Sequence, residues 1–125
     1  MGMYTEIVVG VSLKRDAPKS VIERCKSLVN GEEYLLRGGS YYFPITHGHA
    51  EMRFDDIKKE WELQARSNIK NYGSEIEDFF EWIAPYVDDD SFMGYSMYEE
   101  ADSPTLWFSK GGVAKAVNTE VKETH

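Results

Sequence analysis

The chain has 125 residues and a formal net charge of −8, and 42% of its residues are hydrophobic and 14% aromatic. This is a common size for a single domain, and the supply of core-forming side chains excludes an intrinsically disordered protein despite the charge. The single cysteine, Cys25, excludes an intramolecular disulfide, and no stretch approaches the roughly 20 apolar residues that a membrane span needs. We therefore expect a cytoplasmic protein that does not bind membranes.

The first 30 residues predict a strand followed by a helix. Residues 4–13 alternate between apolar and polar side chains, which is typical of a strand. We expect Asp16 to cap the helix, with Pro18 in its first turn. The apolar residues of this helix fall on one stripe and are Val21, Ile22, Cys25, Leu28 and Val29.

The middle of the chain predicts a long loop, a hairpin and a second helix. Glycines and a proline interrupt residues 32–49, which leaves a loop with room for a short edge strand. Residues 50–54 and 60–69 alternate in polarity and predict an antiparallel hairpin. Ser74 and Glu77 form a capping box, and the helix that they open ends near Pro85.

Two more strands, over 92–99 and 105–109, complete the predicted elements, and residues 113–117 look like a weak extension after Gly111 and Gly112. The order β-α-β-β-α-β-β predicts an α+β fold with an antiparallel-rich sheet and two helices on one face, ferredoxin-like with an added strand. We expect one domain over residues 1–118 and a polar C-terminal tail over 119–125.

Charge is distributed unevenly along the chain. Residues 1–73 carry 10 acidic and 11 basic side chains, whereas residues 74–125 carry 12 acidic and 3 basic ones. Direct binding to nucleic acid is therefore not expected, because it needs clustered cations. The alternatives for the acidic half are ordinary solubilising charge or a binding face for a protein with a basic surface. This predicted face comprises Glu75, Asp78, Glu81, Trp82, Tyr86, Asp88, Asp89, Asp90 and Tyr98.

Two other segments are candidate sites. An aromatic run beside a cation predicts an alternative pocket for a small molecule or nucleotide, built from Arg37, Tyr41, Tyr42 and Phe43. The metal-ligand spacing of His47, His49 and Glu51 is a weak signal, because no other segment clearly supplies a fourth ligand. We expect no cofactor and no metal.

No catalytic motif is evident, and the protein is more simply interpreted as a binding protein than as an enzyme. Cys25 lies on the apolar stripe of the first helix, where a thiol acts as a small hydrophobe. Glu99, Glu100 and Asp102 lack the loop spacing of a calcium site and are expected at a solvated hairpin end.

Several segments resemble a family of small uncharacterised proteins of bacteriophages, prophages and their bacterial hosts. The similar segments are Tyr4-Thr5-Glu6, Leu13-Lys14-Arg15-Asp16-Ala17-Pro18 with Val21-Ile22, Lys70-Asn71-Tyr72, Ser74-Glu75-Ile76-Glu77, Trp82-Ile83-Ala84-Pro85-Tyr86-Val87 and Tyr98-Glu99-Glu100. The resemblance implies a phage setting but no assigned activity or site residues.

The leading hypothesis is a non-enzymatic protein-binding module, a phage-borne inhibitor of a host or defence protein that uses the acidic face. The alternative is a small-molecule or nucleotide-binding domain that uses the aromatic segment near residues 37–43. An exposed sheet edge leaves a homodimer open in either case.

Overall fold

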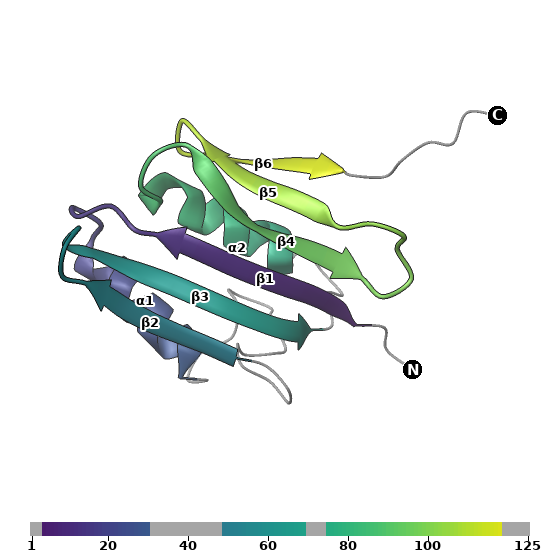
Figure 1. Cartoon of the computed structure of the whole chain (residues 1–125), viewed down its shortest axis with the longest axis horizontal. Coiled ribbons are helices and arrows are strands. Elements are labelled where there is room, and N and C mark those ends of the chain that lie inside the picture. Colours follow the sequence, from purple (N-terminus) through teal and green to yellow (C-terminus); the bar gives the residue numbers. More distant parts are fainter. Residues whose placement is uncertain (1–3, 31–48, 70–74, 119–125) are drawn as a thin grey trace.

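A computed structural model describes residues 4–30, 49–69 and 75–118 (Figure 1). Six strands form one antiparallel sheet, and two helices pack against it. The elements are β1 (Thr5–Ser12), α1 (Lys19–Val29), β2 (His49–Asp55), β3 (Glu60–Ile69), α2 (Glu75–Ile83), the 3-10 helix η1 (Ala84–Tyr86), β4 (Ser91–Tyr98), β5 (Thr105–Lys110) and β6 (Val113–Asn118). Neither described helix is long and apolar enough to cross a membrane.

The strands follow the order β2-β3-β1-β4-β5-β6, so β1 lies inside the sheet between β3 and β4. Both helices lie on the same side of the sheet (Figure 1). The predicted α+β class, the antiparallel sheet and the two helices are confirmed.

Residues 113–118 differ from the prediction. They form a separate strand, β6, which pairs with β5 along its whole length, and not a weak extension of β5. Gly111 and Gly112 make the two-residue turn between them with φ of 58° and 79°. Consecutive positive φ values suit the twist of a tight hairpin and are easily adopted by glycine.

The start of α1 also corrects the prediction. The helix cap is Pro18 and not Asp16, and no side-chain hydrogen bond caps the helix. The Pro18 carbonyl accepts hydrogen bonds from the N–H groups of Val21 and Ile22. The physical reason is that a residue before proline avoids the helical region, so Ala17 cannot be the first helical residue.

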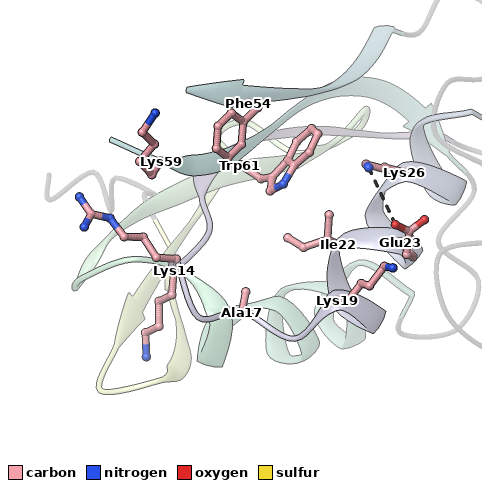
Figure 2. Close-up of a pocket in the computed structure, with 10 residues that line it drawn as sticks. Lys14, Ala17, Lys19, Ile22, Glu23, Lys26, Phe54, Lys59 and Trp61 are labelled. Atoms are coloured by element: carbon pink, nitrogen blue, oxygen red, sulfur yellow. Dashed lines mark ion pairs between the residues drawn. The ribbon is translucent and has the colours of Figure 1, made fainter. Parts of the chain in front are cut away.

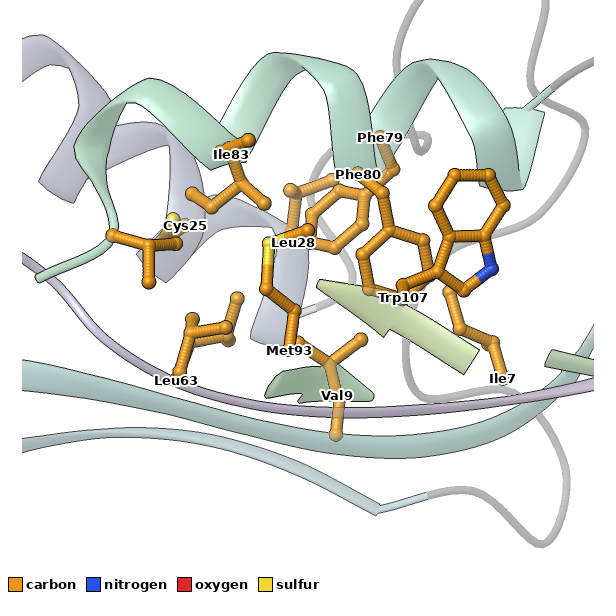
Figure 3. Close-up of a cluster of buried hydrophobic side chains, with 14 of the residues drawn as sticks. Ile7, Val9, Cys25, Leu28, Leu63, Phe79, Phe80, Ile83, Met93 and Trp107 are labelled. Atoms are coloured by element: carbon orange, nitrogen blue, oxygen red, sulfur yellow. The ribbon is translucent and has the colours of Figure 1, made fainter. Parts of the chain in front are cut away.

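The core lies between the helices and the inner face of the sheet (Figure 3). Alternate residues of β1, among them Ile7 and Val9, point into it and are almost fully buried. Phe80 of α2 stacks on Trp107 of β5, with ring centroids 4.9 Å apart. This contact joins the second helix to the part of the sheet beyond β4.

Substitution of Gly94 tests the close pairing of β4 with β1. Gly94 has φ of 150°, and a Cβ atom there would lie 1.9 Å from the Val8 carbonyl oxygen. We expect Gly94→Ala to lower the free energy of unfolding by roughly 3 kcal/mol or more, measured by urea denaturation. Gly10→Ala is the matched control, because a Cβ there meets nothing within 4 Å. Equal stability changes for the two variants would contradict this account.

Candidate functional site

Three connections meet at the end of the sheet where β1 leads into α1. The Lys14 N–H donates to the Tyr86 carbonyl at 2.8 Å, and the Asp88 N–H donates to the Ser12 carbonyl at 2.7 Å. The Arg15 Nε donates to the Lys58 carbonyl at 2.8 Å. These bonds hold the β1–α1 turn against both the β2–β3 hairpin and the loop before β4.

The β2–β3 hairpin is shaped by Asp55. Its Oδ1 accepts hydrogen bonds from the N–H groups of Ile57 and Lys58, at 2.9 and 3.2 Å. These two bonds hold the pKa of the Asp55 carboxyl below its ordinary value, and the bond from Lys58 has the larger effect. Lys59 completes the turn with φ of 61°. The hairpin therefore presents two adjacent lysines at the same end of the sheet as Lys14 and Arg15.

A cleft of about 350 Å³ lies between this hairpin, the β1–α1 turn and the first turns of α1 (Figure 2). Trp61 and Ile22 face the space from opposite sides, and lysines lie along its rim (Figure 2). We call it the basic cleft; its described lining residues are Lys14, Arg15, Ala17, Lys19, Ile22, Glu23, Lys26, Phe54, Lys59 and Trp61.

The lining of the basic cleft is strongly cationic for so acidic a protein. Among its described residues five side chains are positive and only Glu23 is negative. The Glu23 carboxylate lies 3.9 Å from the Lys26 ammonium, so part of its charge is offset. The start of α1 adds to the positive potential, because the N–H groups of its first turn carry partial positive charge and no acidic residue in that turn offsets it.

One wall of the basic cleft is aromatic. Phe54 and Trp61 make an edge-to-face contact with ring centroids 5.3 Å apart, and Phe54 is 41% exposed. The Lys26 ammonium lies 4.4 Å from the centroid of Trp61. The cleft therefore offers a planar apolar surface directly beside its cations.

A second, shallower cavity of about 540 Å³ adjoins the basic cleft and shares Lys14 and Arg15 with it. Its other described lining residues are Asp16, Glu60 and Asp88. We call it the carboxyl cavity. Three effects raise the pKa of Glu60: a side-chain hydrogen bond with Asp88, the desolvation of Glu60 and the negative charge of Asp88.

The structure separates the members of the predicted acidic face. The prediction for Glu75 was wrong: we expected it to face solvent, but it is buried and only 8% exposed. Asp90 accepts a hydrogen bond from the Gly111 N–H at 2.9 Å and so holds the β5–β6 turn. Asp89 accepts one from the Asp90 N–H at 2.8 Å. Much of the acidic run thus has a structural explanation.

The exposed acids of this face are Glu81 and the Asp88–Asp90 run. Glu81 is exposed, and beside it the half-buried rings of Trp82 and Tyr86 lie 6.3 Å apart. Asp78 is only partly exposed. Tyr98 does not join this group, because it pairs with Thr5 at the opposite end of β1 from the Asp88–Asp90 loop.

Most residues of the other predicted sites belong to the segment 31–48. Arg37, Tyr41, Tyr42, Phe43 and His47 lie outside the described residues. His49 and Glu51 lie two residues apart in β2, at the edge of the sheet. Within the described residues no group of three or more His, Cys, Asp or Glu side chains could hold a metal ion.

Cys25 fits the structural interpretation drawn from its place on the apolar stripe. Its side chain is fully buried, and burial raises the pKa of the thiol to about 12. A thiol in this state is a poor nucleophile near neutral pH.

Sequence reasoning missed the basic cleft. The one signal for it was that cations occur in two turn segments, Lys14-Arg15 to Lys19 and Lys58-Lys59, each close to aromatic or apolar strand residues. Comparison of the chain with family models, curated proteins and solved structures finds no significant match. Function is therefore inferred from the geometry of the site.

The raised pKa of Glu60 gives a stability prediction. The folded state raises the pKa of Glu60. Protonated Glu60 therefore stabilises the fold at low pH, and this contribution is lost as the pH rises through that pKa. In Glu60→Gln, the amide can donate to Asp88 at every pH. We expect this variant to unfold at a higher temperature than wild type near pH 7, with the difference vanishing near pH 4.

The control is Glu100→Gln, which makes the same charge change in the exposed β4–β5 turn. Thermal unfolding across this pH range checks the prediction. If Glu60→Gln is less stable than wild type near neutral pH, Glu60 and Asp88 do not destabilise the fold at that pH, and the prediction is contradicted.

Proposed function

We propose that the protein is a binding module for a small organic anion that carries a planar ring, such as a nucleotide. The observation that carries the proposal is the basic cleft, in which five of the described side chains are cationic and line the same space as an aromatic wall, on a protein of net charge −8. The proposal keeps the predicted ligand-binding class but moves its location from residues 37–43 to the β1–α1 turn and the β2–β3 hairpin.

The energetics of such a site are adequate for a useful affinity. A hydrogen bond to a charged group contributes about 1.5–3 kcal/mol, and stacking of a base on an aromatic side chain about 1–3 kcal/mol. A micromolar dissociation constant corresponds to about 8 kcal/mol. Two or three anion contacts from residues such as Lys14, Arg15 and Lys19, with one ring contact at Phe54, sum to roughly 4–12 kcal/mol before the cost of association is subtracted.

Size and surroundings favour a small ligand over a nucleic acid strand. The cleft volume lies within the range of small-molecule sites. Asp16 and Asp88 line the adjoining cavity and would repel the phosphates of a strand that continued past the cleft. These acids limit the length of a polyanion that can bind.

We also infer that the first four strands and two helices follow the ferredoxin-like plan predicted from the sequence. Support comes from the order β2-β3-β1-β4 and from the helices that follow β1 and β3. The β5–β6 hairpin is then an addition at the β4 edge.

The proposal is tested by titrating ADP into the protein by isothermal titration calorimetry. Lys14→Gln with Lys19→Gln should weaken ADP binding at least about tenfold, because each cation is worth at least 1.4 kcal/mol when it contacts a phosphate. The control is Lys110→Gln with Lys115→Gln, an equal charge change on exposed lysines of the β5–β6 hairpin. Equal losses in the two double variants would indicate only general attraction between charges.

The ring contact is tested separately with Phe54→Leu. This substitution should weaken binding of ADP severalfold and leave binding of inorganic pyrophosphate unchanged, because only ADP has a ring to stack. Absence of ADP binding to wild type at millimolar concentration would refute the proposed function.

A second candidate function is the predicted attachment to a protein with a basic surface. The exposed Glu81 beside the half-buried Trp82 and Tyr86 favours it, because aromatic rings next to acids are suited to a cationic partner. The phage setting of such a partner remains a prediction.

The test of this candidate leaves Asp88 and Asp90 unchanged, and Asp89→Asn keeps the side-chain oxygen that accepts from the Asp90 N–H. Glu81→Lys with Asp89→Asn should remove a partner that wild type retains in a pull-down at moderate salt. Glu100→Lys with Asp102→Asn, in the exposed β4–β5 turn, should retain it. Retention by all three proteins, or by none, would count against this function.

A further inference from the structure

We propose that the ligand is a nucleoside diphosphate ester, in which a pyrophosphate joins a ring-bearing nucleoside to a second group rich in hydroxyls, such as a sugar. This inference rests on the proposed function and specifies its ligand class. It follows from the way in which the basic cleft and the carboxyl cavity share their cations.

The two cavities lie on either side of one cationic bridge. Lys14 and Arg15 line both of them, whereas the aromatic wall lies only in the basic cleft and the carboxyl pair only in the carboxyl cavity. Trp61 and Glu60 are neighbours in β3, and adjacent strand residues point to opposite faces of a sheet. A ligand that contacts both must therefore pass over the Lys14–Arg15 turn, and its anionic part lies in the middle.

The bridge is held in place by the main chain. Lys14 is bonded through its N–H to Tyr86, and the Arg15 Nε donates to the Lys58 carbonyl at 2.8 Å. The remaining donors of the Arg15 guanidinium can contact a phosphate. A pyrophosphate is long enough to meet both cations, and it carries the negative charge that the site attracts.

The carboxyl cavity selects the group attached to the far end of the pyrophosphate. Glu60 is 6% exposed and lines this cavity with Asp88, whose own N–H donates to the Ser12 carbonyl at 2.7 Å. Together with Asp16 these acids repel a terminal phosphate. Carboxylates accept hydrogen bonds from sugar hydroxyls, as at the ribose of dinucleotide sites. A neutral group with several hydroxyls therefore fits this cavity better than a third phosphate.

Three probes with the same adenosine end test the inference by isothermal titration calorimetry: ADP, ATP and ADP-ribose. Wild type should bind ADP-ribose at least about tenfold more tightly than ATP. Asp88→Asn removes a charge from an exposed position, and it should reduce this preference to about threefold or less. Glu60→Gln should reduce it in the same direction. Asp102→Asn, an equal charge change in the distant β4–β5 turn, should leave the preference at its wild-type value.

The outcomes separate the two proposals. If ADP binds and depends on Lys14 and Lys19, but ATP binds as tightly as ADP-ribose, the proposed function stands and this inference is wrong. The inference is also overturned if Asp88→Asn and Glu60→Gln both keep the wild-type preference for ADP-ribose over ATP. If none of the three probes binds, the proposed function and the inference fail together.

Discussion

The antiparallel pairing of β1 on both of its edges is the constraint on which the rest of the structure depends. β3 and β4 both pair with β1, so its alternate side chains are buried against the helices and its register is fixed from two sides. Gly94 permits a close approach of β4 to β1, because only a residue without Cβ fits against the Val8 carbonyl there. With β1 fixed in this way, the turn that follows it, and therefore Lys14 and Arg15, has a defined place.

Charge is organised in three dimensions differently from its order along the chain. The acidic half of the sequence contributes Asp90 to a turn and Asp88 to a carboxyl pair, and Glu75 is buried. The nearly neutral first half supplies all five cations of the basic cleft. The distribution of charge along the sequence does not show this cleft, because folding brings together cations from the β1–α1 turn, α1 and the β2–β3 hairpin.

The elements that the sequence predicted well are those with strong local periodicity. Residues 60–69 form β3 as expected, because Trp61, Leu63 and the alternate residues after them give a period-two pattern that only a strand can bury. The start of α1 was misplaced since the effect of Pro18 on Ala17 outweighed the capping tendency of Asp16. The basic cleft could not be predicted, because it depends on long-range contacts such as Arg15 to Lys58 that leave no periodic signal.

In the proposed function, the acids of the adjoining carboxyl cavity would make the cations of the basic cleft more selective. A cationic surface alone attracts any polyanion, and its affinity falls with salt because the interaction is long-range. Here Asp16, Glu60 and Asp88 lie directly beyond the bridge formed by Lys14 and Arg15. These acids therefore limit the length of the region that attracts an anion. In the proposed function, this geometry would exclude a long polyanion and favour a ligand whose charge lies between two neutral ends. Acidic residues would in this way contribute to the selectivity of a basic site.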